Sequence, residues 1–220
     1  MLALAFGLYA WWRSGALDGW LPEPFVQPDG EAAFARWLEE EPERGDAFLA
    51  LERFLEDEGV ADIVPAWQLA RVDAFYAARC DISPFAIPPE DLWRNVVPAL
   101  RLVRDEVVPV TGPVQVLSSW RSPATNVCAR GASRSNHLDF AALDLVTQDR
   151  RRGADFYALL CEMQQAAGAD SGMGLGAYID PADPGAASGR FHIDAEGFRR
   201  WGGDYTSRTD PCPALARPAP

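Results

Sequence analysis

Ser135-Asn-His-Leu-Asp-Phe-Ala-Ala-Leu-Asp-Leu-Val146 is the stretch of sequence that decides the fold of the second half of this chain. Its last six residues, 141–146, form a short run that is apolar apart from Asp144, which predicts a strand. Along this strand Asp144 points to one face of the sheet, while His137 enters from the preceding turn. The stretch therefore predicts a polar pair at the start of a buried strand.

A second strand is predicted over residues 189–194, where the period of two places His192 and Asp194 on the same face. Two neutral imidazoles and one carboxylate suit catalytic zinc, which takes three protein ligands and keeps a fourth position for water. Spacing alone leaves open whether these histidines are ligands or ordinary core or surface residues.

The remaining patterns of the second half predict one more strand and one helix. Residues 114–119 are β-branched at the start and follow a Gly-Pro turn, which indicates a strand. A helix that ends at Gly168 has an apolar stripe of Phe156, Leu160, Met163 and Ala167. Strands mixed with a helix, without regular alternation, favour the α+β class.

Three helical stripes are predicted in the first half. One has Asp46 as a plausible N-cap and Gly59 as a stop, and a second carries Leu69, Val72 and Tyr76. A third covers residues 92–107, where Pro98 should kink or divide it. Residues 31–58 hold ten acids against three arginines, a balance of -7, which indicates a solvated helix face.

Composition excludes some functions for the 220-residue chain. Its net charge is -12, which argues against nucleic acid as the main partner because such binding needs clustered cations. With two histidines in all, a three-histidine metal site is excluded. The four cysteines are compatible with two disulfides in any of three pairings, and equally with free buried thiols.

The ends of the chain carry their own expectations. Residues 1–12 are apolar and uncharged but shorter than the ~20 residues of a membrane-spanning helix. We expect a shortened signal sequence or membrane anchor within residues 1–24, and the alternative is an N-terminal helix packed on the fold. A Pro- and Ala-rich tail is expected over residues 204–220, and from Asp210 onward it is expected to be loosely held.

Several ordered motifs carry a resemblance to a known family. Residues 135–144 resemble the S-x-H-x-x-G-x-A-x-D motif of the zinc D-Ala-D-Ala carboxypeptidases and murein endopeptidases with the Hedgehog-like fold. Residues 119–126 are similar to that family's S-G-Y-R-S-P-x-x-N segment, and residues 131–133 resemble its small-residue loop. Its closing G-x-G-x-Y, F-V-H-x-D and R-x-W patterns resemble residues 172–178, 191–194 and 200–201. The resemblance covers residues 105–203.

The resemblance implies an organisation and a ligand set. It implies a Hedgehog-like α+β domain with an antiparallel sheet over residues 105–203. The charge and helical patterns described above predict an acidic helical region before it, over residues 25–104. The resemblance also implies that His137, Asp144 and His192 bind Zn²⁺.

The resemblance further implies a reaction. Arg121 would lie by the scissile carbonyl or the substrate carboxylate, and Ser135 and Asn126 would contact substrate. A zinc-bound water would attack a peptidoglycan peptide at or near D-Ala, in the periplasm or on a membrane anchor that faces it. Asp194 is the candidate general base, and its alternative role is to orient a ligand.

Two departures from the family motif leave a rival function open. Phe140 stands where the motif has Gly, and Gly189 stands where many relatives have an acid. Both favour a non-catalytic zinc module that binds peptidoglycan or a partner protein. A third reading makes the acidic first half an adaptor for a basic partner.

Overall fold

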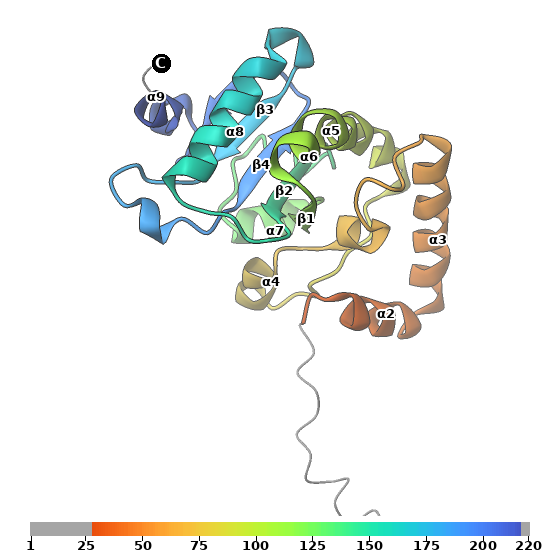
Figure 1. Ribbon diagram of the computed structural model, residues 1–220. Coiled ribbons are helices and arrows are strands. Elements are labelled where there is room, and N and C mark those ends of the chain that lie inside the picture. Colours follow the sequence, from red (N-terminus) through yellow and green to blue (C-terminus); the bar gives the residue numbers. More distant parts are fainter. Residues whose placement is uncertain (1–27, 217–220) are drawn as a thin grey trace, which may run out of the picture.

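Five short strands form the sheet at the centre of this protein (Figure 1). The computed structural model describes residues 28–216. The strands are β1 (Val114–Ser118), β2 (Ala142–Thr147), β3 (Gly174–Ala177), β4 (Phe191–Asp194) and β5 (Arg199–Trp201). The α+β class is therefore confirmed, and the three predicted strands correspond to β1, β2 and β4.

The strand order is β1-β2-β4-β3-β5, and one neighbouring pair is parallel. The expectation of a wholly antiparallel sheet is wrong at this edge. Both edges of β4 are already paired, with β2 and β3. The chain therefore turns back after β4 and adds β5 to the far side of β3, in the direction of β3.

Helices precede the sheet and cover one of its faces (Figure 1). The α-helices are α2 (Glu31–Glu39), α3 (Pro42–Asp57), α4 (Ala74–Cys80), α5 (Val96–Leu102), α6 (Val108–Thr111), α7 (Pro123–Cys128), α8 (Ala154–Ala167) and α9 (Cys212–Leu215). Short 3-10 turns are η1 (Ala66–Ala70), η2 (Glu90–Asn95), η4 (Ala169–Ser171), η5 (Pro184–Ala186) and η6 (Ser207–Thr209), and η3 (Val103–Val107) is a π-turn. The helix predicted to end at Gly168 is α8, which is confirmed.

Capping residues explain where the first-half predictions differ from the structure. Helix α3 begins at Pro42 rather than after Asp46, because proline is preset for the first helical position. The helix predicted through Val72 is interrupted there. Asp73 accepts hydrogen bonds from the backbone nitrogens of Phe75 and Tyr76 and starts α4 anew.

Pro98 lies in the first turn of α5, where a missing backbone N–H removes no intrahelical hydrogen bond. The predicted division occurs directly before α5, where the 3-10 turn η2 ends at Asn95. Helix α5, the π-turn η3 and α6 then continue without a break to Thr111.

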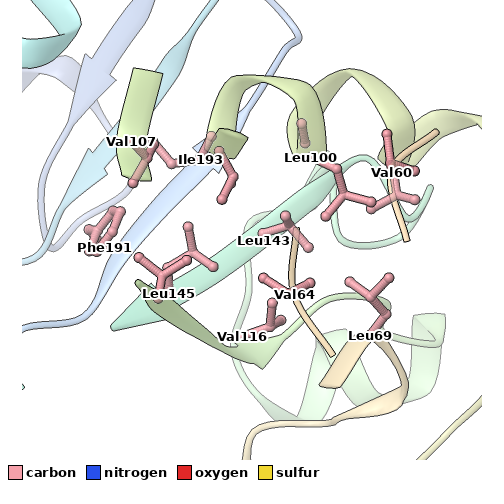
Figure 2. Close-up of a cluster of buried hydrophobic side chains, with 14 of the residues drawn as sticks. Val60, Val64, Leu69, Leu100, Val107, Val116, Leu143, Leu145, Phe191 and Ile193 are labelled. Atoms are coloured by element: carbon pink, nitrogen blue, oxygen red, sulfur yellow. The ribbon is translucent and has the colours of Figure 1, made fainter. Parts of the chain in front are cut away.

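The sheet has an apolar face and a polar face, because side chains alternate along each strand. Leu143, Leu145, Phe191 and Ile193 are fully buried, and α5 packs on their strands, β2 and β4. Figure 2 shows these side chains pointing toward Leu100 and its neighbours on the helical run. Each such side chain stabilises the fold by roughly 1.5–3 kcal/mol. The opposite face is left for polar residues.

The helical first half shares this core. Val60, Val64 and Leu69 pack beside Val116 and Leu143 (Figure 2). The first half is thus packed against the sheet and is not an independent extension.

The first half also covers the free edge of β1. Gln68 Oε1 accepts a hydrogen bond from the backbone nitrogen of Val116 at 2.8 Å, and Arg71 donates to the carbonyl oxygen of Val116 at 2.7 Å. An edge strand without such cover is open to pairing with another chain.

Both pairs of cysteines form disulfides, so the alternative of free thiols is wrong. Cys80–Cys128 joins α4 to α7, and Cys161–Cys212 joins α8 to α9. Because each bridge closes a loop of about 50 residues, each stabilises the fold by about 4 kcal/mol in the chain-entropy model.

Only one of the expectations for the two ends of the chain falls on described residues. The predicted signal or anchor, residues 1–24, and residues 217–220 lie outside the described residues. The described part of the tail is held in place, since Cys212 is buried and bridged to α8. Within residues 28–216, no helix has the length and apolar character needed to cross a membrane.

Candidate metal centre

One row of paired residues crosses the polar face of the whole sheet. Strand register aligns Ser118, Asp144, His192, Gly176 and Trp201, one from each strand. The row brings Asp144 and His192, 48 residues apart in the sequence, onto neighbouring strands. The alternation that buries the leucines of β2 therefore builds half of the candidate site.

His137 completes the group from the turn before β2. Its carbonyl oxygen accepts a hydrogen bond from the backbone nitrogen of Arg121 at 2.9 Å, which fixes this turn against the segment after β1. Ligand atoms of His137, Asp144 and His192 all lie within 4.8 Å of one another, and all three residues are buried. The structure thus brings together the three residues predicted as ligands.

The hydrogen bonds of His137 define which nitrogen faces the site. Nδ1 bonds the carbonyl oxygen of Ser119, which can only accept, so Nδ1 carries the hydrogen. Nε2 has no hydrogen-bond partner and lies 3.1 Å from Asp144 Oδ2. Burial, followed by the charge of Arg121, lowers the pKa of His137 to about 4 and keeps the ring neutral.

His192 is held from both sides by carboxylates. Its Nε2 lies 3.0 Å from Asp194 Oδ2 and its Nδ1 lies 3.2 Å from Asp144 Oδ1. Burial opposes the charged ring, but hydrogen bonds to these two carboxylates raise the pKa of His192. In the neutral form of the ring, Nε2–H donates to Asp194, and the lone pair of Nδ1 then faces the side of the site where Asp144 lies.

This donor set fits a metal ion. The neutral Nε2 of His137 and the ionised Asp144 Oδ2 are two lone-pair atoms 3.1 Å apart in a buried site. Two such atoms repel unless a cation lies between them. Each imidazole also gives its outer nitrogen to a backbone or carboxylate oxygen, as ligating histidines do. The set of two nitrogens and one oxygen suits Zn²⁺.

Asp144 also receives two guanidinium groups. Its Oδ2 accepts from Arg121 at 2.6 Å and from Arg190 at 2.5 Å. Burial alone would raise the pKa of Asp144, but Arg190 and the two histidines hold it well below the usual range. Arg190 also donates to Asp73 at 2.6 Å, so the residue that caps α4 supports the centre. Sequence spacing gave no signal for Arg190 or Asp73.

Strand β3 supplies space rather than side chains. A Cβ on Gly176 would lie 2.8 Å from Trp201 Nε1 and 2.9 Å from His192 Cβ, and one on Gly174 would lie 2.5 Å from Asp194 Oδ1. The two glycines let side chains of β5 reach across β3 to β4. The alternating glycines were the missed signal, because glycine-rich segments are poor strand candidates.

Asp194 supports His192 and has no free oxygen for other work. Besides His192, it accepts from the backbone nitrogen of Glu196 at 2.9 Å and from two nitrogens of Arg199 at 3.0 and 2.9 Å. It is fully buried, although it faces the cavity edge. These contacts favour the orienting role over that of general base.

Phe140 adopts the left-handed backbone conformation that the glycine of the motif adopts easily. Its φ is +56°, and its side chain is fully buried in the apolar core. Phe140 is not among the residues that line the cavity at the metal centre. The expected bulk near the metal loop is therefore directed away from it.

Gly189 has no room for the acid found in relatives of the resembled family. Its φ is +83°, and a Cβ there would overlap the carbonyl oxygen of Arg151. An acid at this position would require the chain before β4 to move.

A cavity of about 610 Å³ opens over the three candidate ligands. Arg121 and Ser135 line it, as predicted for substrate contacts. Asn126 lies outside it, buried, and donates to the carbonyl oxygen of Ala132 at 3.0 Å, so it holds the neighbouring loop. The cavity also has walls that the sequence did not indicate, from Tyr76, Tyr178, Arg190 and Tyr205.

No family model, curated protein or solved structure matches the chain. The inference of function therefore depends on the site itself and on the motif resemblance described above.

Proposed function

We propose that this protein is a zinc metallopeptidase that hydrolyses peptidoglycan peptides at or near D-Ala. The observation that carries the proposal is the convergence of His137, Asp144 and His192 at the floor of an open cavity. The unpartnered Nε2 of His137, which faces the carboxylate, is what a metal ligand would present.

A bound Zn²⁺ would polarise a peptide carbonyl and lower the pKa of water toward ~7. The chain's own residues do the positioning. Ser119 and Asp194 fix the rings of the two histidines. Arg121 is buried at the cavity wall, where its guanidinium can donate to the oxyanion of a reacting carbonyl or to a substrate carboxylate. Burial raises the pKa of Tyr178, which keeps its phenol a neutral donor.

The test is metal content together with peptidase activity. We expect purified protein to hold about one equivalent of zinc by plasma mass spectrometry and to release D-Ala or cleaved peptide from muropeptides. Asp144→Asn should lose both. Asp149→Asn, an exposed aspartate on the turn after β2, is the matched control and should lose neither. Full zinc content in Asp144→Asn, or unchanged hydrolysis after chelation, would contradict the proposal.

A second candidate is a zinc-containing module that binds peptidoglycan without cleaving it. Among residues 28–216, the carboxylates that line the cavity are Asp144, a candidate ligand, and Asp194, whose oxygens are fully bonded. Within this described range, no carboxylate that lines the cavity is then free to take a proton from water. Mass spectrometry of muropeptides after prolonged incubation decides between the two: retention of intact peptide on zinc-loaded protein supports the module.

A further inference from the structure

Arginines are concentrated in the cavity, although the chain as a whole is strongly acidic. The net charge is -12, yet five arginines line the cavity against two aspartates: Arg121, Arg134, Arg190, Arg199 and Arg200 against Asp144 and Asp194. A concave site lined by one sign of charge attracts ligands of the opposite sign.

Four of these arginines are at least partly neutralised by acids. Asp144 forms ion pairs with both Arg121 and Arg190, and Asp73 forms a second one with Arg190. Asp194 forms an ion pair with Arg199. The fourth, Arg200, has one contact, at 3.4 Å to Asp210. Each of the four lies near a carboxylate of the protein itself.

Arg134 differs from the other four. It is exposed at the lip of the cavity, and no hydrogen bond or ion pair engages it within the described part of the chain. It leaves one uncompensated positive charge beside the site.

The lip that carries Arg134 is held in place on both sides. Asn126 binds the carbonyl oxygen of Ala132 at 3.0 Å, and the backbone nitrogen of Ser135 donates to the same oxygen at 3.2 Å. Ser135 Oγ in turn accepts from the backbone nitrogen of His137 at 3.4 Å. Arg134 therefore stands on a fixed turn next to the metal centre.

The distance along the chain limits where a ligand group can lie. Arg134 and His137 are three residues apart, so their Cα atoms are separated by at most about 10 Å. An extended peptide rises about 3.3 Å per residue. A ligand group that meets Arg134 then lies within a few residues of the group at the metal centre.

We propose that Arg134 selects acidic peptides, by binding a carboxylate within a few residues of the bond held at the metal centre. The inference rests on the proposed function for the position of that bond. It adds the substrate class: a peptide with a free carboxylate besides the one at its C-terminus. Tyr76 and Tyr205, on the same cavity, offer apolar faces to the ligand's backbone and stem.

The test uses the zinc-loaded full chain and two synthetic peptides, acetyl-Ala-Glu-Ala-D-Ala-D-Ala and its Gln counterpart. The preference is the ratio of kcat/KM where the peptides are hydrolysed, and the ratio of Kd from calorimetry where they are not. At low salt we expect the Glu peptide to be favoured about five-fold, because the ion pair is partly exposed. Arg134→Ala should reduce the ratio to about one, and Arg134→Lys should restore part of it.

The control is Arg53→Ala, which removes an exposed arginine of α3 outside the cavity and should keep the full preference. Equal values for the two peptides with wild-type protein, or an undiminished preference in Arg134→Ala, would overturn the inference while leaving hydrolysis in place. A Kd preference without hydrolysis would support the inference and overturn the peptidase. Displacement of the Glu peptide by equimolar inorganic phosphate would assign the site to anions in general and overturn a peptide-specific role.

Discussion

At the scale of single residues, hydrogen bonds outside the candidate metal site prepare the two histidines. Ser119 fixes the tautomer of His137 through its carbonyl oxygen, and Asp194 fixes that of His192 through its carboxylate. Neither partner would be a ligand. Each imidazole is nevertheless oriented before any ion binds, which lowers the entropy cost of binding.

The buried, neutral His137 gives the metal-free protein a pH-dependent stability. Its pKa is about 4 in the folded protein against 6.5 in the unfolded chain, because of burial and the charge of Arg121. Between these values the unfolded chain binds more protons, so stability falls as the pH falls from 6.5 to about 4. The loss amounts to about 3 kcal/mol. Urea unfolding of chelated protein across this range measures it.

His137→Gln is the matched variant, and most of this pH dependence should disappear in it. His192 does not share this loss, because its raised pKa means that the folded protein holds this proton more tightly than the unfolded chain does. A wild-type stability that is flat from pH 6.5 to pH 4 would contradict the assigned neutral state of His137.

The sequence predicted the candidate ligands better than their surroundings. Zinc accepts few residue types and the chain has two histidines, and the motif resemblance added to this spacing implied His137, Asp144 and His192 as the set. The orienting partner of His137 is a backbone carbonyl, which every residue possesses, so no side chain marks it. Arg190 contacts Asp144 only because the fold brings together two residues that are 46 positions apart, and no spacing rule predicts such a contact.

At the scale of elements, β3 determines whether side chains of β5 can contact those of β4. It lies between them in the sheet, and its polar-face positions are Gly174 and Gly176. The absence of side chains there lets Arg199 reach Asp194 and lets Trp201 lie with its ring centre 5.1 Å from that of His192. A larger residue at position 174 or 176 would push the side chains of β5 away from His192 and Asp194 on β4.

Gly176→Ala tests this role of β3. The added methyl group meets Trp201 and His192 at less than 3 Å, so we expect a loss of stability of roughly 1–3 kcal/mol. Zinc affinity should fall on the order of ten-fold, because His192 must move. Competition with a chromogenic chelator measures the affinity. Gly45→Ala in α3, where nothing lies within 4 Å, should keep the affinity and raise stability by up to about 1 kcal/mol. Equal zinc affinity in the two variants would refute the argument.

Helix and strand positions were predictable where apolar periodicity was strong, as in α8 and β2. Helix boundaries were not predictable where a single capping residue begins a new helix, as Asp73 does for α4. Capping satisfies backbone hydrogen bonds and leaves no mark in the apolar pattern. The parallel strand β5 was missed for a related reason. Three residues with two arginines carry little apolar signal of their own.

At the scale of the whole molecule, the first half completes the sheet that carries the site. Gln68 and Arg71 bond the free edge of β1, and Tyr76 lines the cavity. The acidic helices α2 and α3 contribute no residue to the lining of the cavity. The acidity of the chain and the cationic character of the cavity therefore belong to different surfaces.

Removal of the first half tests this dependence. A truncated chain that begins at residue 105 exposes the edge of β1 and loses Leu69 and Leu100 from the core. We expect it to aggregate or to lose its near-ultraviolet circular dichroism, since it retains an open edge and an incomplete core. A chain that begins at residue 28 is the control and should stay monomeric by size-exclusion chromatography. A monomeric shorter chain that retains zinc would show that the sheet folds alone.

The two disulfides follow one another along the chain and do not overlap: the first loop ends at Cys128, and the second opens at Cys161. A protease cut between residues 129 and 160 therefore yields two fragments that separate in denaturant, each with its own bridge intact. A cut at residues 81–127 or 162–211 yields fragments that stay linked until a reductant is added. Gel migration with and without reductant thus locates a nick relative to the bridges.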